Sequence, residues 1–583
     1  MKEELEGVLW KAAGLLAFAA AVMSFPLAAQ LGEVFTPTHT RQSWNPLALA
    51  TGLFKGTTQW PAAATAVLAV CLVLIAGLYF GAIFSTGRTG GHRELAKRLA
   101  TGGELAPLQA RKRSKEAAQL HPNAVDLVPG QRVGTTAAGR NAVLYQGWRD
   151  LGACCMGPGS GKTSCFVIPR MAAAPGPALM TSNKVDGVAE VIAARHSMGA
   201  IWLFDPNKIY RQSDKPDFTF NPLSEIHGTE DAVRLASWII TASSKNNSSS
   251  GEQAKEDAQF GPSGESCVAW ALLAASLTGK TLADVHAWIS QGAYEAIKDI
   301  LADHGYDRPA AEMGGFDKWP DRTRGSLVAT TQRMCRDLVH EAILAWTTPA
   351  PGIRAFDPSA FMDGRQTMIL LSERGPGGAG AIITAMIKAI CNAAIQKTPG
   401  QARLTVPLVG ELDEVANIVP WPTLPQDFSH FGSRGLCFTV YLQGWSQGCG
   451  EWGVKGMETL WQMTGIRVIG SNDEPAWLEG ISKLIGTYQR PVPGSQVRER
   501  LPKASVEDLG NLPKFTAVLT TSITPAALIT LTPWHKIREL KKRINAGMGT
   551  ADRLAQGLEL GPAPVAIQPA AIAAGPIKES EAA

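Results

Sequence analysis

A glycine-rich stretch limits the folds that this chain can adopt more than any other part of its sequence. Residues 156–164 read Met-Gly-Pro-Gly-Ser-Gly-Lys-Thr-Ser, with a short apolar segment at 151–155 before them and another at 165–168 after them. Glycines let backbone N–H groups close around phosphate oxygens, while a lysine binds the phosphates and a hydroxyl binds Mg²⁺. The pattern therefore predicts a strand, a phosphate-binding loop and a helix, in the order typical of an α/β nucleotide-binding domain.

The loop predicts a role for each of its residues. Lys162 is expected to contact the β- and γ-phosphate oxygens of ATP, and the Thr163 hydroxyl is expected to bind Mg²⁺. The strict pattern G-x-x-x-x-G-K-[ST] would place glycine at position 156, where this chain has Met156. A glycine-rich surface turn is the alternative interpretation. The predicted ATP-binding residues are Gly157, Pro158, Gly159, Ser160, Gly161, Lys162, Thr163 and Ser164.

Two adjacent acids follow another apolar segment. Residues 406–412 are predicted to form a strand that runs into Asp413 and Glu414. An acid at the carboxyl end of a strand can hold the water shell of Mg²⁺, and a neighbouring glutamate can activate the attacking water. Asp413 is therefore the candidate Mg²⁺-side acid and Glu414 the candidate general base. In isolation such a pair would be a solvated turn, but after a phosphate-binding loop we favour the catalytic interpretation.

Three more residues are candidates for the same chemistry. Gln443 ends the predicted strand 436–442 and is expected to sense the γ-phosphate, with a simple polar strand end as the alternative. Arg374 and Arg434 are candidates for an arginine supplied to a neighbouring subunit, because arginine neutralises the charge that develops in phosphoryl transfer; either would also fit an ordinary surface position. The G-x-G-x-x-G pattern at 375–380 lacks the acid that dinucleotide binding requires about twenty residues later, so it predicts a tight turn.

The N-terminus is predicted to anchor the chain in a membrane. Two apolar stretches, at about 10–32 and 61–84, are long enough to cross a bilayer as helices. A cleaved signal peptide is the alternative for the first. Lysine and arginine are frequent after the second stretch, whereas the intervening loop has only Arg41 and Lys55. A multi-pass protein of the inner (cytoplasmic) membrane is therefore expected, with both termini and the soluble domains in the cytoplasm.

The remaining chain is predicted as a mostly parallel α/β sheet domain in two parts, 131–241 and 348–545. Short β-rich runs alternate there with longer helical stretches. The segments outside this domain are the anchor 1–87, a basic juxtamembrane linker 88–130 and a disordered tail 546–583 rich in Ala, Pro and Gly. The predicted strands, besides 406–412 and 436–442, are 178–181, 200–204, 367–371, 466–469 and 517–520.

An all-α domain is predicted to interrupt the sheet domain at 242–347. It opens with the flexible polar linker Ser243–Gly251 and continues as a helical pattern without a convincing strand. Thr281 and Asp284 match a capping box, which predicts a helix over Leu282–Leu301.

The order of these features resembles that of a known family. Two N-terminal spans, a phosphate-binding loop, a helical insertion, a strand ending in Asp-Glu and a later strand ending in Gln resemble the type IV secretion coupling proteins, the TraG/TraD family of conjugative DNA translocases. The resemblance extends to about residue 540. Two residues depart from the family pattern. Met156 stands at the first glycine position of the loop, and Ser182 stands where an acid is common. Further similar segments are Thr181–Lys184, Phe220–Leu223, Asp413–Asn417, Ser471–Glu474 and Ile481–Gly486.

The resemblance implies a RecA-like P-loop ATPase that uses ATP and Mg²⁺. It further implies a homo-hexamer, anchored in membrane lipid, that delivers a relaxase-bound single DNA strand to the components of a type IV secretion channel. The alternative is a nucleotide-gated receptor or secretion ATPase for protein substrates that does not pump DNA. The net charge of +4 does not separate these functions, because a pore needs only local basic loops.

Overall fold

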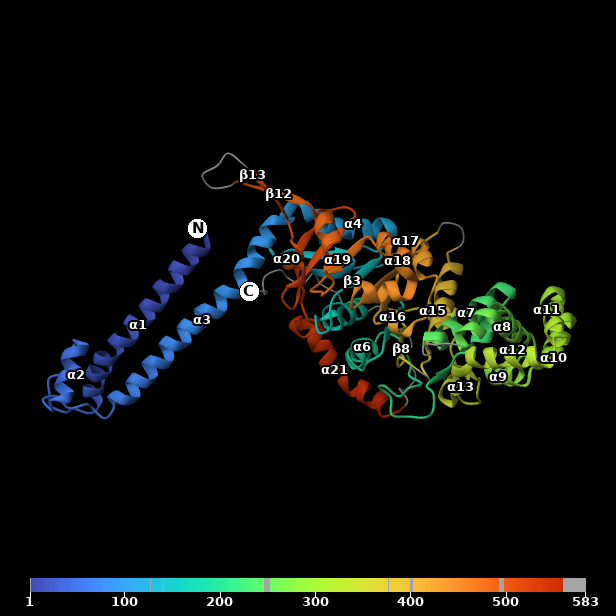
Figure 1. The fold of residues 1–583 in the computed structure, drawn as a ribbon, viewed down its shortest axis with the longest axis horizontal. Coiled ribbons are helices and arrows are strands. Elements are labelled where there is room, and N and C mark those ends of the chain that lie inside the picture. Colours follow the sequence, from blue (N-terminus) through green and yellow to red (C-terminus); the bar gives the residue numbers. More distant parts are fainter. Residues whose placement is uncertain are drawn as a thin grey trace. The chain divides into compact units, whose positions relative to one another are not determined.

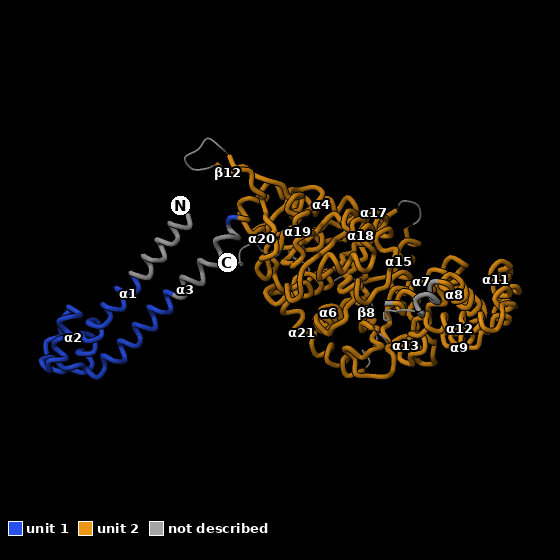
Figure 2. Tube along the Cα trace, in the orientation of Figure 1, with its two compact units in different colours: residues 1–94 blue, residues 95–583 orange. Residues whose placement is uncertain are grey.

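The computed structural model describes residues 2–558, except 126, 140, 246–251, 376, 399–401 and 492–497. The chain divides into two compact units, residues 1–94 and residues 95–583 (Figure 2). Most of the predicted tail, 559–583, lies outside the described residues.

The first unit contains three helices: α1 (Lys2–Phe35), α2 (Pro46–Phe54) and most of α3 (Ala64–Arg98). Among the described residues, only α1 over Leu16–Phe35 is long and apolar enough to cross a membrane, while the apolar part of α3, Ala64–Tyr79, is shorter. The first predicted span thus coincides with a suitable helix. The structure does not support a second span, so the two-helix anchor remains a prediction.

The second unit is built on a mixed, mostly parallel sheet, as predicted (Figure 1). Its strand order is β2-β1-β15-β14-β11-β3-β10-β9-β4-β8-β5. The run from β11 to β5 is parallel, and the strands on the other side are antiparallel. The strands are β1 (Gln131–Thr136), β2 (Val143–Gln146), β3 (Gly152–Cys155), β4 (Ala178–Ser182), β5 (Ile201–Phe204), β8 (Thr367–Leu371), β9 (Leu408–Leu412), β10 (Leu436–Leu442), β11 (Ile466–Ile469), β14 (Thr516–Thr521) and β15 (Ala527–Thr530).

Two small sheets lie outside the main one. One pairs β6 (Phe218–Thr219) with β7 (Arg354–Ala355), and the other is the exposed hairpin β12 (Thr487–Pro491) and β13 (Arg498–Pro502).

Helices cover both faces of the main sheet, which explains why its central strands are apolar throughout. All seven residues of β10 are buried. Leu436, Phe438 and Val440 belong to one hydrophobic core, and Cys437 and Tyr441 belong to the other. The core of Cys437 includes residues of α5 (Ile168–Ala173), α6 (Val188–Arg195) and α21 (Arg538–Ala555), and the core of Leu436 includes residues of α15 (Gly380–Gln396), α17 (Leu424–Arg434), α18 (Trp445–Met463), α19 (Pro475–Ile485) and α20 (Val506–Gly510).

The structure corrects two boundaries of the sheet domain. The predicted linker 88–130 contains the 3₁₀-helix η1 (Gly102–Leu108) and the helix α4 (Ala110–Leu120). It is tied to the sheet because buried Arg113 donates a hydrogen bond to Asp150 over 2.7 Å. At the other end, α21 includes residues 546–555, which the sequence analysis assigned to the disordered tail.

The insertion is helical, and the described part of 242–347 contains no strand. Ser243, which was predicted to open a flexible linker, lies in helix α7, and its buried hydroxyl donates to Asp337 over 3.4 Å. The predicted capping box of Thr281 is present, but the predicted helix is split in two, since Gly292 adopts left-handed φ and ends the first half. The helices are α7 (Thr229–Lys245), α8 (Glu252–Leu277), α9 (Leu282–Gln291), α10 (Tyr294–Asp303), α11 (Asp307–Asp317), α12 (Asp321–Met334), η4 (Arg336–Val339) and α13 (Glu341–Thr347).

Candidate functional site

The glycine-rich loop leaves the carboxyl end of β3 and enters a π-helical turn, η2 (Thr163–Val167), that continues into α5. Gly159 and Gly161 have φ of 70° and 98°, left-handed values that glycine adopts without strain. The backbone N–H of Gly157 donates to the Ser471 carbonyl over 2.9 Å. The loop is therefore fixed to the strand-end segment beside it, as a phosphate-binding loop requires.

Met156 is accommodated by a glycine that directly follows the neighbouring strand, β11. Its side chain is buried, and it is not among the residues with positive φ, so the backbone here does not require glycine. Gly470 follows β11, and a Cβ atom at Gly470 would lie 2.6 Å from the Met156 side chain. The methionine thus fills space that Gly470 leaves open, which explains the departure from the strict motif.

Lys162 folds back over the loop. Its ammonium donates to the carbonyl oxygens of Met156 and Gly157, over 2.7 and 3.2 Å, and the residue is buried. A buried ammonium inside a loop of backbone N–H groups is suited to bind phosphate oxygens.

Asp413 meets the loop at the carboxyl edge of the sheet. The Thr163 hydroxyl donates to the Asp413 carboxylate over 2.9 Å, and the Thr181 hydroxyl donates to the Asp413 carbonyl over 2.7 Å. Burial raises the pKa of the Asp413 carboxyl from its usual 3.8 to about 6; the nearby charge of Glu414 also raises it, while the Thr163 hydrogen bond and Lys162 lower it. The two residues predicted to bind Mg²⁺ are therefore neighbours.

A hydroxyl and a carboxylate are oxygen donors of the kind that Mg²⁺ prefers in nucleotide sites, where water and phosphate complete the shell. Among the described residues, no group of three or more His, Cys, Asp or Glu is arranged to hold a metal. The Thr163 hydroxyl and the Asp413 carboxylate fit an Mg²⁺ ion that takes its other oxygens from nucleotide and water.

Glu414 and Gln443 are also in contact. The Gln443 side-chain amide donates to Glu414 Oε1 over 2.6 Å. Glu414 has a φ of 55°, in the left-handed region that is uncommon for residues other than glycine. It precedes the short helix α16 (Val415–Ile418), whose Asn417 side chain donates to Glu414 Oε2 over 2.5 Å. Sequence did not predict this contact of Asn417, which lies three residues after the predicted general base.

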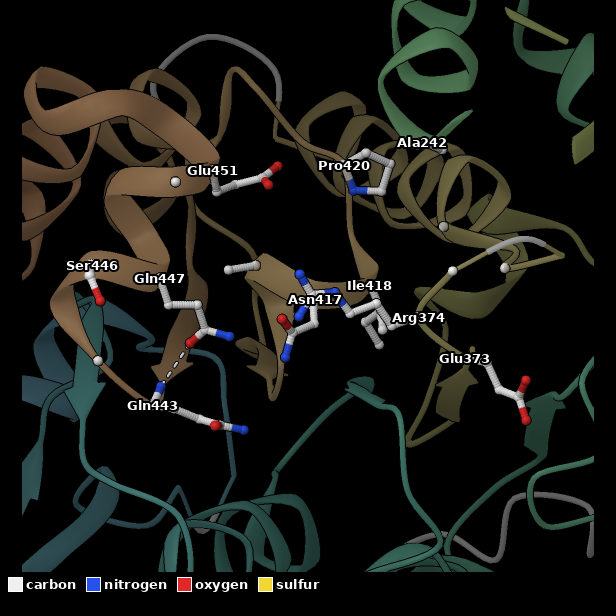
Figure 3. A pocket seen from close by; sticks show the side chains of 16 residues that line it. Ala242, Glu373, Arg374, Asn417, Ile418, Pro420, Gln443, Ser446, Gln447 and Glu451 are labelled. Carbon is white, nitrogen blue, oxygen red and sulfur yellow. Dashed lines mark hydrogen bonds between the residues drawn. The ribbon is translucent and has the colours of Figure 1, made fainter. Parts of the chain in front are cut away.

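Two cavities open beside these residues. One, of about 420 Å³, is lined by the glycine-rich loop together with Ser471–Glu474 and Leu512–Thr516. The other, of about 660 Å³, includes Arg374, Asn417 and Gln443 in its lining (Figure 3). Gln443 lines both, so it lies between the glycine-rich loop and the larger cavity.

The two candidate arginines differ in position. Arg374 is exposed and lies at the carboxyl edge of the sheet, after β8. Arg434 ends α17 just before β10 begins, at the amino edge, and its guanidinium donates to the Thr398 carbonyl over 2.6 Å. Of the two candidates, Arg374 rather than Arg434 lies at the edge that holds the loop.

A buried polar group beneath the site was not identified from sequence. Glu411 on β9 accepts a hydrogen bond from the Tyr441 hydroxyl and lies 3.8 Å from Arg170 of α5. Arg170 also donates to the Thr439 hydroxyl over 2.9 Å. Burial raises the pKa of the Glu411 carboxyl to about 7, against the opposing effect of Arg170. Nothing in the sequence indicated that Glu411, Arg170 and Tyr441 contact one another in the protein interior.

The fold is a mixed, mostly parallel α/β sheet with a glycine-rich loop of the P-loop pattern at its carboxyl edge. Residues 407–501 match the family model described as the TraM recognition site of TraD and TraG. The matched segment contains Asp413, Glu414 and Gln443. No curated protein matches the chain by sequence.

Solved structures of the bacterial conjugative coupling protein TrwB have a similar fold. The unbound monoclinic form of TrwBdeltaN70 is 17% identical, with a TM-score of 0.51, and the similarity covers 71% of this chain and 92% of that one. The TrwB complex with the non-hydrolysable ATP analogue ADPNP gives the same values. The complex with ADP and Mg²⁺ is 16% identical over the same shares, with a TM-score of 0.50. The family match and the shared fold confirm the resemblance to TraG/TraD coupling proteins.

Proposed function

We propose that this chain is a membrane-anchored, ATP-driven DNA translocase that couples a relaxase-bound single strand to a type IV secretion channel during conjugative transfer. The observation that carries the proposal is the contact of Thr163 with Asp413, beside a glutamate and a glutamine at the ends of neighbouring parallel strands. TrwB, whose fold is similar, is described as a plasmid coupling protein and has been solved with nucleotide and Mg²⁺. Both the site and the fold support a nucleotide-driven motor.

In this proposal, residues 157–164 bind the phosphates of ATP, and Lys162 neutralises the β- and γ-oxygens. Thr163 and Asp413 hold Mg²⁺, which neutralises charge on the transferred phosphoryl group. Glu414 accepts the proton of the attacking water.

Gln443 is proposed to sense the γ-phosphate, since it contacts Glu414 and lines the cavity at the loop. Arg374 is the favoured candidate for the arginine supplied between subunits, because it is exposed at the carboxyl edge, whereas Arg434 contacts Thr398.

Assembly and location belong to the same proposal. A homo-hexamer in the inner membrane, anchored through α1 and α3, would surround a single DNA strand and receive the relaxase from the cytoplasm. The helical insertion 242–347 is proposed as a domain that contacts substrate. A nucleotide-gated receptor or secretion ATPase for protein substrates is the second candidate, since the site geometry is the same for either cargo.

The test of the catalytic part is the Lys162→Ala variant of the full-length protein, assayed for phosphate release from ATP. Loss of the ammonium that neutralises the phosphates is expected to reduce turnover by about 100-fold or more. Turnover by a folded Lys162→Ala protein close to that of the wild type would refute the assignment of the loop.

A further inference from the structure

Asn417 holds the proposed general base through both its side chain and its backbone. Its side-chain amide donates to Glu414 Oε2 over 2.5 Å, and its backbone N–H donates to the Glu414 carbonyl over 2.9 Å. Gln443 donates to the other carboxylate oxygen, Oε1, over 2.6 Å. Each oxygen of the Glu414 carboxylate therefore accepts one amide N–H.

These contacts fix Glu414 in one orientation. The residue is buried and has left-handed φ, a conformation that persists only where the surroundings impose it. The helix that follows, α16, has four residues, too few to be stable by itself. The amide of Asn417 and the contact with Gln443 are therefore the described interactions that determine where the carboxylate points.

The same contacts oppose the chemistry that Glu414 is proposed to perform. A general base must direct a carboxylate lone pair at the attacking water, so the orientation of the carboxylate matters. With both oxygens engaged by amides, the carboxylate is held toward its protein partners. Each oxygen keeps a further lone pair, but the carboxylate cannot turn freely toward water while both contacts hold.

Asn417 is the amide suited to be released. Its side chain lines the cavity of about 660 Å³, as Figure 3 shows, so it has space in which to turn from Glu414 toward another acceptor. Gln443 lines the same cavity, but its backbone is held on both sides: its N–H donates to Gln447 Oε1 over 2.9 Å, and its carbonyl accepts from Asn472 over 3.3 Å.

We propose that Asn417 is a positioning residue that restrains Glu414 and thereby limits basal ATP hydrolysis. The inference rests on the proposed function, since it assigns regulation to the same catalytic site.

The test measures basal kcat and KM for ATP in full-length protein carrying Asn417→Ala or Asn417→Asp. Removing a hydrogen bond to a charged group is expected to raise basal kcat by about tenfold. KM should stay within about twofold, because Asn417 does not contact the phosphate-binding loop in the described structure. Asn417→Asp retains the size of the side chain, replaces the amide donor with a like charge, and is expected to act in the same direction.

Ser446→Ala is the matched control, since Ser446 lines the same cavity but its hydroxyl donates to Glu474 rather than to Glu414. It should leave kcat unchanged. Adding Glu414→Gln to Asn417→Ala should remove the gain, because the released group is then no longer a base.

A folded, ATP-binding Asn417→Asp protein whose kcat is unchanged or reduced would overturn the restraint, a reduction indicating that Asn417 orients the base productively. If the wild type itself hydrolyses no ATP, the proposed function fails. A wild type that hydrolyses ATP beside variants that are not faster refutes only the role of Asn417.

Discussion

At the scale of single residues, Asp413 carries a charge that burial opposes and that the proposed Mg²⁺ binding would require. Its carboxyl has a pKa of about 6, above the usual 3.8. In the pH range between these values the folded chain binds more protons than the unfolded chain, so stability from this group falls as the pH rises toward 6. Above pH 6 the Asp413 carboxylate is ionised in the folded protein, and its burial lowers the free energy of unfolding unless a bound cation compensates the charge.

The Asp413→Asn variant tests this cost. The amide keeps an oxygen that can accept from Thr163 but carries no charge. Without nucleotide or Mg²⁺, the variant is expected to be more stable than the wild type at pH 7.5 by roughly 3 kcal/mol, from a pKa difference of about two units. The gain should vanish near pH 4.

Thermal melting of both proteins across this pH range checks the prediction, with ATP turnover lost in the variant as the accompanying readout. A stability difference that stays constant from pH 4 to pH 7.5 would show that the charge of Asp413 is not the cause.

At the scale of elements, sequence predicted the buried parallel strands best. The predicted boundaries of β8, β10 and β11 agree with the structure, because these strands lie between two helical layers and are apolar on both sides. The strands β1 and β2 were not predicted, since they are short, contain polar residues and pair with a register shift between Arg132 and Gly134.

The candidate site was predictable where its residues form a short sequence pattern next to a predicted strand. The loop, Asp413 and Gln443 all follow apolar strands, and parallel strands bring their carboxyl ends to one edge. Asn417 was not predictable, because its contact depends on the left-handed backbone of Glu414. The neighbourhood of Glu411 and Arg170 depends on the packing of α5 against β9, which no local pattern encodes.

The pairing of Met156 with Gly470 makes a prediction about the strand ends that hold the loop. Gly470→Ala places a Cβ atom 2.6 Å from the Met156 side chain, so it is expected to destabilise the protein by about 1–3 kcal/mol through overpacking. Met156→Gly in the same chain should relieve most of this cost. Denaturant unfolding of the two single variants and the double variant measures the coupling; strictly additive effects would mean that the two positions do not compensate each other.

At the scale of the whole molecule, the two predicted membrane spans fix on which side each segment of the chain lies. If about 10–32 and 61–84 both span the membrane, reporters fused near residue 45 and after residue 120 should report opposite sides. The expectation follows from the lysine and arginine residues that come after the second stretch. Cytoplasmic signals from both fusions would contradict two spans, and a mature N-terminus near residue 31 would indicate a cleaved signal peptide.

Binding of DNA distinguishes the proposed translocase from the alternative receptor for protein substrates. A translocase must hold the phosphate backbone, so the full-length protein should bind single-stranded DNA with little sequence preference. Its affinity should fall steeply with salt, with a slope of about −0.7 per phosphate contact, because bound lysines and arginines release condensed counterions. The Glu414→Gln variant should still bind both ATP and DNA but should not turn over, which separates binding from hydrolysis.

The most direct measurement is the ATP hydrolysis rate of the assembled, full-length oligomer at low salt, with and without single-stranded DNA. The account predicts faster hydrolysis with DNA, because a bound strand would order the subunit interfaces at which Glu414 and a neighbouring arginine act. The stimulation should be absent from Lys162→Ala and should weaken as salt rises. An oligomer that hydrolyses ATP but neither binds single-stranded DNA nor is stimulated by it would contradict DNA translocation and favour the receptor for protein substrates.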